Sequence, residues 1–291
     1  MRVRARLGLL VLGLFSVLTA AAAPNAVVET VQAPAWVERG ERRLPLAPGM
    51  QLENRDRVLT GSGARLIVQM ADGSAVKFGE NVNATVNAMK QGENGLFSAA
   101  LDVSKGAFRL TTDIFQKFQR QRAINIRTGT VTIGIRGTDV WGRSNDEKDF
   151  VCLLEGHIVA SHPLGEAVEL SEPLQFYSAD KGQAPGAVAT VDKLQLAKWA
   201  VETELQSGIA TQQTGGRWGL SFGRLNEDGA LTLHDQLSAA GYAGRIRPVP
   251  VPGGYLYELR LEKLVTEREA QSLADKLARE LNIPAPAIRR H

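Results

Sequence analysis

Residues 65–78, RLIVQM-ADGS-AVKF, decide the fold class of the middle of the chain. Two segments in which apolar side chains alternate with others, Arg65–Met70 and Ala75–Phe78, flank the pair Asp72-Gly73. Alternation with a period of two is the pattern of a half-buried strand. Asp-Gly between two such segments is a strong hairpin signal, because glycine adopts a positive φ at no steric cost. The stretch therefore predicts an antiparallel β-hairpin.

Short strands and turns of the same kind continue through residues 52–160. Strands that recur every ~8–12 residues are typical of an all-β sandwich, roll or short solenoid. We therefore expect residues 24–160 to form a β-rich domain, with its single cysteine, Cys152, buried in the apolar run Phe150–Leu154. The further strands are expected at residues 84–89, 97–103, 107–110, 123–127, 131–133, 139–143 and 150–154.

The whole chain has the composition of a globular protein and not of a collagen, a coiled coil or a disordered protein. Of its 291 residues, 44% are hydrophobic and 22% are charged, and the length fits about two domains. One cysteine excludes a disulfide framework and a zinc site built from several thiolates. Residues 24–291 contain 31 basic and 31 acidic residues, so no broad attraction to nucleic acid is expected.

The first 23 residues have the three parts of a secretory signal peptide. Arg2, Arg4 and Arg6 precede the apolar run Leu7–Leu18, and small residues follow up to Ala23. This run is shorter than the ~20 residues that span a bilayer, so we expect cleavage and export rather than a permanent anchor. No later segment reaches membrane-spanning length, and in a bacterium the predicted location is the periplasm.

Residues 161–216 are expected to link two domains, because residues 161–190 are rich in Pro, Gly and acidic residues. The helix expected in this region places Leu194, Val201 and Leu205 on one face. The expected segments are a strand at 174–178, the helix at about 191–205, and a flexible tether at 207–216.

Residues 217–291 contain a duplicated unit of strand and helix. Gly241 is placed to end the first helix, and Thr266 with Glu269 forms a capping box at the start of the second. The order βαββαβ predicts a small α+β domain, a four-stranded antiparallel sheet with two helices on one face and the other face open. The expected elements are strand 217–222, helix 231–240, strands 244–249 and 255–261, a helix from residue 266, and strand 287–290.

Several motifs in the middle of the chain resemble the FecR domain family in their order. They are DRVLTG at 56–61, ADGS at 71–74, IRTG at 126–129, IRGTD at 135–139 and LEGHI at 154–158. The family name is associated with iron-uptake signalling through a membrane protein that regulates a sigma factor. Because a signal peptide stands where such a transducer has its cytoplasmic and spanning parts, the resemblance implies an envelope module. The guanidinium of Arg136 is expected to donate hydrogen bonds within the fold, to loop carbonyls or to a carboxylate such as that of Asp139. The alternative is that Arg136 binds a carboxylate of a ligand.

The last ~75 residues resemble the SPOR domain, through WGLSFG at 218–223, LSAAGY at 237–242 and GYLYELRL at 254–261. That family binds peptidoglycan glycan strands stripped of their peptides, so the resemblance implies peptidoglycan as the partner. Strand alternation turns the polar side chains of this domain toward the open sheet face, where Gly219 and Gly223 would let a sugar ring approach the backbone. The candidate binding residues are Ser221, Arg245, Arg247, Glu258, Arg260 and Arg289.

Catalytic, metal and cofactor sites are not expected. Gly219–Gly223 is a literal G-x-S-x-G, but Ser221 falls in the middle of a strand and not on the sharp turn that a nucleophile requires. We interpret the chain as an exported, non-enzymatic envelope protein that binds peptidoglycan and, through its β domain, other envelope proteins. The alternative is a signalling or assembly scaffold that binds only proteins. The sequence departs from the SPOR pattern at Ser221, Glu258, Glu262 and Lys263, and these departures count against glycan binding and favour the alternative.

Export gives the first testable prediction. In a bacterial host, the full chain should reach the periplasm and lose ~2 kDa, whereas a chain without residues 1–23 should stay in the cytoplasm. Mass spectrometry of the envelope fraction measures this directly. Recovery of the protein with Met1–Ala23 still attached would identify an anchored protein instead.

Overall fold

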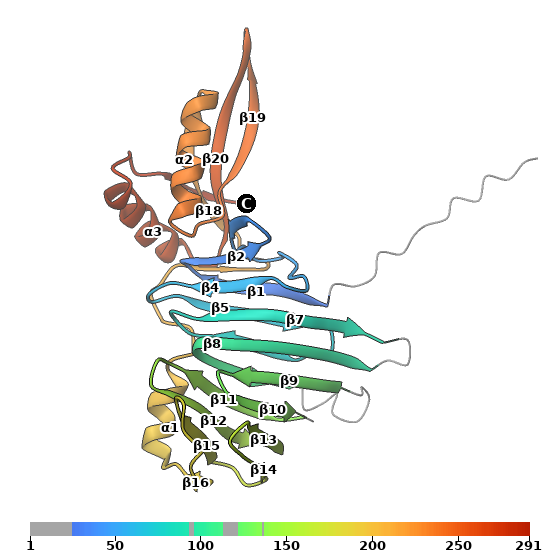
Figure 1. Ribbon diagram of the computed structural model, residues 1–291. Coiled ribbons are helices and arrows are strands. Elements are labelled where there is room, and N and C mark those ends of the chain that lie inside the picture. Colours follow the sequence, from blue (N-terminus) through green and yellow to red (C-terminus); the bar gives the residue numbers. More distant parts are fainter. Residues whose placement is uncertain (1–24, 93–95, 113–121, 136) are drawn as a thin grey trace, which may run out of the picture.

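The computed structural model describes residues 25–92, 96–112, 122–135 and 137–291 (Figure 1). Strands account for 52% of the chain and the described ranges contain three helices, so the fold is mostly β. The expected signal peptide and Arg136 lie outside the described residues. In the described ranges, no helix combines the length and the apolar character that crossing a membrane requires.

The larger part of the molecule is a sandwich of two sheets, which Figure 1 shows stacked below the C-terminal helices. Sheet A contains, in spatial order, β16 (Ala189–Thr190), β15 (Gln175–Asp180), β12 (Lys148–Glu155), β11 (Asp139–Ser144), β8 (Phe97–Thr111), β6 (Ala75–Phe78), β5 (Arg65–Met70) and β1 (Ala26–Gln32). Sheet B contains, in the same way, β3 (Arg42–Pro45), β2 (Ala35–Arg39), β4 (Arg57–Thr60), β7 (Asn83–Gln91), β8, β9 (Arg122–Thr128), β10 (Val131–Ile135), β13 (Ile158–His162) and β14 (Gly165–Leu170).

Strand β8 belongs to both sheets. Its residues up to Lys105 pair with β7 in sheet B, and its residues from Gly106 onward pair with β11 in sheet A. Gly106 has a φ of 90°, and a Cβ there would lie 2.5 Å from Cγ2 of Val82, so only glycine fits at this crossing point. Apolar side chains from both sheets, such as Phe97 and Leu110, are fully buried between them.

The predicted hairpin is confirmed as β5 and β6, with the expected bounds. The strands expected at 97–103 and 107–110 are one continuous strand, β8. Residues 161–190, expected to be a linker, add β14, β15 and β16 to the two sheets. The acidic strand β14 is a mostly exposed edge strand, so it lacks the apolar alternation that reveals a half-buried strand.

Helix α1 (Lys193–Ala200) is shorter than expected and packs through a different face. Its N-cap is Asp192, and the predicted stripe is wrong because Leu194 and Val201 are 79% and 64% exposed. The helix is held instead by Trp199, whose ring stacks on that of Trp141 with centroids 5.2 Å apart. This aromatic cluster lies on the outer face of sheet A and covers Cys152, which is buried as predicted. Burial raises the pKa of the Cys152 thiol to about 12.

The expected flexible tether contains a strand that joins two parts of the molecule. Strand β17 (Thr211–Gln213) pairs with β1 of the sandwich over three residues and meets β20 (Gly254–Leu264) at the pair Gln212–Leu264. The amide of Gln32 donates to Gln206 O at 2.8 Å and to Thr211 Oγ1 at 3.0 Å. The prediction of a flexible tether is wrong for Thr211–Gln213, because a polar composition does not prevent main-chain pairing with existing strands.

The C-terminal elements follow the predicted βαββαβ order. They are β18 (Trp218–Leu225), α2 (Glu227–Ala239), β19 (Arg245–Val251), β20, α3 (Glu267–Glu280) and β21 (Ala287–Arg290). The spatial order β19–β20–β18–β21 makes a four-stranded antiparallel sheet, and the helices pack on one face of it (Figure 1). Gly241 ends α2 with a φ of 81°. One half of the predicted capping box is present, since the Oγ1 of Thr266 accepts from the Glu269 amide, whereas the Glu269 carboxylate accepts from the amide of Thr211.

The C-terminal sheet and helices also contact the sandwich through Trp36 of β2. Its Nε1 donates to Ser238 O at 3.0 Å, and its ring packs against Gly241, where a Cβ would lie 2.9 Å from the ring and 2.6 Å from Pro34 Cβ. Together with β17, this contact holds the two parts in one arrangement.

Limited proteolysis tests this docking. The native chain should resist cleavage at residues 207–216, because Thr211–Gln213 pairs with β1 and Gln212 also pairs with Leu264 of β20. Trp36→Ala should weaken the contact by about 1–3 kcal/mol and release a fragment of about 8 kDa that begins near residue 217. Arg43→Ala is the matched control, since it removes only the guanidinium that lies 4.2 Å over the Trp36 ring. Rapid cleavage of the native chain at Gly215-Gly216 would contradict the docked arrangement.

Candidate functional site

A groove of ≈ 460 Å³ opens on the C-terminal sheet. Leu220, Leu259 and Leu261 are buried toward the helices, so the residues that alternate with them face the groove. The lining residues are Ser221, Gly223, Arg224, Glu258, Arg260, Arg289, Arg290 and His291. We call this feature the arginine groove.

The structure brings together four of the six predicted binding residues: Ser221, Glu258, Arg260 and Arg289. The other two do not line the groove. Arg245 and Arg247 lie on β19, and their guanidinium groups turn to Glu262, at 3.8 and 3.0 Å. Strand alternation predicted the face correctly, but it could not predict that Glu262 would pair with both arginines.

Three residues of the groove were missed from the sequence: Arg224, Arg290 and His291. The register between β18 and β20 shifts between Ser221 and Arg224, and Gly223 in that interval has a φ of 81°. Such an irregularity re-aims the side chains that follow it, so Ser221 and Arg224 share a face although they are three residues apart. A glycine within a strand pattern is the signal that could have revealed this.

Glu258 is fully engaged by two neighbours. Its carboxylate accepts from Ser221 Oγ at 2.6 Å and from the guanidinium of Arg260. The hydrogen bonds from Arg260 and Ser221 lower the pKa of Glu258, and the Glu258 carboxylate raises the pKa of Arg260. At neutral pH the three side chains therefore carry no net charge as a group.

The two glycines on the predicted open face differ. Gly223 has no atom within 4 Å of the position of a Cβ, so the backbone there is open to a ligand. At Gly219 a Cβ would lie 2.6 Å from Nε2 of His291, so the imidazole covers the space. Beside the backbone, the space that a sugar would need is thus present at Gly223 and is filled at Gly219.

The remaining charge of the groove is positive. Arg224, Arg289 and Arg290 form no ion pair with any carboxylate that the structure describes, and Arg290 lies 5.8 Å from the ring centroid of Trp218. Each guanidinium offers five N–H donors in a planar fork. The arrangement suits a ligand that combines carboxylates with hydroxyl or carbonyl oxygens.

The groove has no arrangement typical of a nucleophile or a metal centre. Ser221 lies within β18 and donates to Glu258, rather than standing on a turn between strand and helix. Among the described residues, no cluster of three or more His, Cys, Asp and Glu could hold a metal ion.

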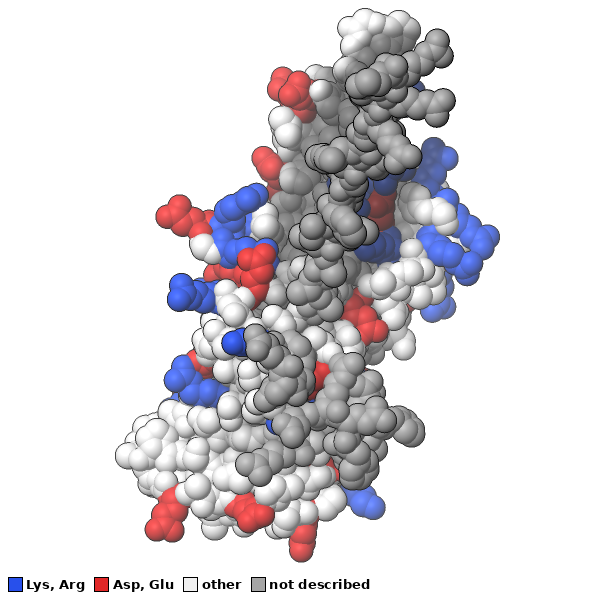
Figure 2. All heavy atoms as spheres, turned by 90° about the vertical axis from the view of Figure 1, so that its right-hand side faces the viewer, with Lys and Arg blue, Asp and Glu red and all other residues white. Residues whose placement is uncertain are grey.

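The charge distribution elsewhere is mixed. Figure 2 shows the face on the right of Figure 1, where the described basic and acidic side chains that are visible neighbour one another. A basic stripe is the usual footprint of nucleic-acid binding, and these visible, described side chains do not form one.

Titration of Glu258 tests the polar network in the groove. Because its pKa in the folded protein is lowered, the stabilisation it gives is present above the pKa of an unfolded glutamate and is lost as the pH falls through the folded value. Side-chain NMR should find Glu258 ionising below the normal range of glutamate, and Ser221→Ala should shift its pKa upward. Ser207→Ala, at an exposed site, should not. An ordinary pKa in the native chain would disprove the network.

Comparison with known proteins identifies one part of the chain. Residues 56–159 match the FecR protein family. Crystal structures of a candidate anti-sigma factor from Parabacteroides distasonis, at 1.65 and 2.50 Å resolution, are each 14% identical, with a TM-score of 0.41, and cover 78% of this chain and 92% of theirs. No curated protein matches the chain. The order of the motifs in the sequence and the family match agree that residues 56–159 form a FecR domain.

Proposed function

We propose that this chain is an exported, non-enzymatic protein of the bacterial cell envelope. In this proposal residues 217–291 bind peptidoglycan glycan strands that have lost their peptides, and the FecR domain is a binding or signalling module for other envelope proteins. No cofactor takes part. The envelope location rests on the signal-like N-terminus, and a buried Cys152 is compatible with an oxidising compartment.

The arginine groove is the observation that carries the glycan proposal. Three arginines without ion pairs to described carboxylates, Arg224, Arg289 and Arg290, surround an open strip of backbone at Gly223. A glycan strand offers hydroxyl groups and N-acetyl carbonyls, and removal of the peptides leaves a carboxylate on each lactyl group. Guanidinium groups donate charge-assisted hydrogen bonds to all of these acceptors.

Glu258 does not oppose this function. An unpaired carboxylate in the groove would repel the lactyl carboxylates, but Glu258 is neutralised by Arg260 and held by Ser221. The ligand would therefore meet the three other arginines, whose positive charge is not balanced within the groove.

A second candidate is a scaffold that binds only proteins. Two observations favour it: Arg260 is already engaged by Glu258, and His291 covers the backbone at Gly219. Both reduce the surface that a sugar could contact. The two candidates differ in whether glycan strands bind at all.

Calorimetric titration of the full mature chain with glycan strands lacking stem peptides tests the proposal. Arg224→Ala with Arg289→Ala should weaken binding by about 1–3 kcal/mol, because charge-assisted hydrogen bonds are lost. Arg245→Ala with Arg247→Ala is the matched control, since these arginines turn to Glu262 outside the groove. An equal loss in both variants would place the glycan elsewhere on the domain. Absence of binding by the native chain would favour the protein scaffold.

A further inference from the structure

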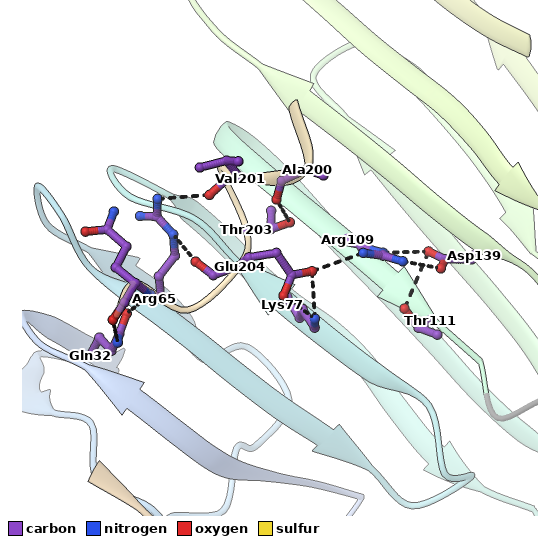
Figure 3. Close-up of polar contacts among 11 residues, drawn as sticks. Gln32, Arg65, Lys77, Arg109, Thr111, Asp139, Ala200, Val201, Thr203 and Glu204 are labelled. Atoms are coloured by element: carbon purple, nitrogen blue, oxygen red, sulfur yellow. Dashed lines mark hydrogen bonds and ion pairs between the residues drawn. The ribbon is translucent and has the colours of Figure 1, made fainter. Parts of the chain in front are cut away.

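Residues 201–206, which we call the strap, follow α1 across the outer face of sheet A and lead through residues 207–210 to β17 (Figure 1). Figure 3 shows the Glu204 side chain between Lys77 and Arg109, with Arg65 reaching the main chain of the strap. The strap has no regular secondary structure of its own, yet it contacts five strands of the sheet, β1, β5, β6, β8 and β11.

The sheet presents a row of cations to the strap. Lys77 on β6 is directly opposite Arg109 on β8, and Arg143 follows on β11. These residues alternate with buried ones such as Val76 and Leu110, so their side chains point away from the core. We call Arg65, Lys77, Arg109 and Arg143 the basic face.

Each member of the basic face binds an acceptor of the strap. The carboxylate of Glu204 accepts from Lys77 Nζ at 2.8 Å and from Arg109 Nη1 at 3.0 Å, and Glu202 accepts from Arg143 at 2.9 Å. Arg65 donates to the carbonyl oxygens of Glu204 and Val201, at 3.0 and 3.3 Å. An extended acidic peptide offers the same two kinds of acceptor, acidic side chains and main-chain carbonyls, so the basic face could bind it in the same way.

The strap does not bury its apolar side chains. Val201 and Leu205 are 64% and 39% exposed, while the side chains of Glu202 and Glu204 bond to the sheet and stay 34% and 43% exposed. A segment that belongs permanently to the core normally buries its apolar side chains and leaves its charges in water. Only Thr203 is buried here. The strap is therefore held mainly by charge and main-chain contacts.

Such contacts are weak enough to be exchanged. Partly exposed ion pairs contribute about 0–1 kcal/mol each, and salt screens them. Gly79 lets the strap approach closely, since a Cβ there would lie 2.4 Å from Glu202 O. Beside the strap lies an open hollow of ≈ 430 Å³, which leaves space for a longer ligand. Its charged lining residues are Arg65, Lys105, Arg143, Glu80 and Glu202.

We propose that the basic face is a docking site for an extended acidic segment of a partner protein, and that the strap is its internal occupant. The recognised feature is a pair of carboxylates two residues apart, as in Glu202-Thr203-Glu204. The partner displaces the strap, while Trp199 and β17 keep its ends in place. This gives the FecR domain a specific partner chemistry. It is independent of glycan binding by the arginine groove.

A labelled peptide with the sequence of residues 199–206 is a direct probe, measured by fluorescence anisotropy on the full mature chain. Glu204→Ala frees Lys77 and the Nη1 of Arg109, whose Nε and Nη2 stay bonded to Asp139 at 2.9 and 2.7 Å. This variant should raise the affinity for the peptide about tenfold over the native chain. Adding Lys77→Gln and Arg109→Gln to this variant should abolish the gain. Glu166→Ala, an exposed acidic residue of β14, is the matched control and should behave as the native chain.

Two further measurements test whether the basic face recognises carboxylates and releases the strap. A peptide with both glutamates replaced by glutamine should not bind, and excess acidic peptide should speed hydrogen exchange of residues 201–206 in the native chain. The native-chain measurement does not depend on the folding of any variant. If Glu204→Ala remains folded and gains no affinity, or if binding persists without Lys77 and Arg109, the basic face is only a structural clamp for the strap.

Discussion

The architecture depends on the change of sheet within β8 at Gly106. A strand of fifteen residues is long enough to serve two sheets only if its backbone turns without a side chain in the way, and Val82 leaves no room for one. Before the turn β8 pairs with β7, and after it with β6 and β11. The turn at Gly106 thereby determines where β8 leaves sheet B and enters sheet A. It also places Arg109 on the outer face of sheet A, beside Lys77.

Much of this fold could be predicted from the sequence, for a local reason. The hairpin at 65–78 and the βαββαβ order of residues 217–291 follow from alternation, turn residues and helix caps, which are properties of neighbouring residues. The failures depend on distant partners. Strand β17 exists because β1 and β20 offer it hydrogen bonds. Helix α1 packs through Trp199 rather than Leu194 because the ring of Trp141 lies on the outer face of the sheet, where Trp199 stacks on it.

The candidate site could likewise be predicted only where neighbouring residues decide the arrangement. Alternation was sufficient to place Ser221, Glu258, Arg260 and Arg289 on one face. It failed for Arg224, since the irregularity at Gly223 changes the side on which later residues emerge. Alternation also could not predict that Arg245 and Arg247 pair with Glu262, because that pairing depends on side-chain conformation and not on strand register.

The strand pairing between β1 and β17 has a mechanical consequence. If the C-terminal end is attached to a rigid polymer and the sandwich is attached to another protein, tension between them runs through three antiparallel residue pairs lying side by side. Load directed along paired strands strains several hydrogen bonds at once, whereas a peeling load breaks them one by one. Because Gln32 bonds to both Gln206 and Thr211, stretching this junction would also pull on residues 201–206. The junction can thus convert tension into a change on the outer face of sheet A, which a disordered connection of the same length could not do.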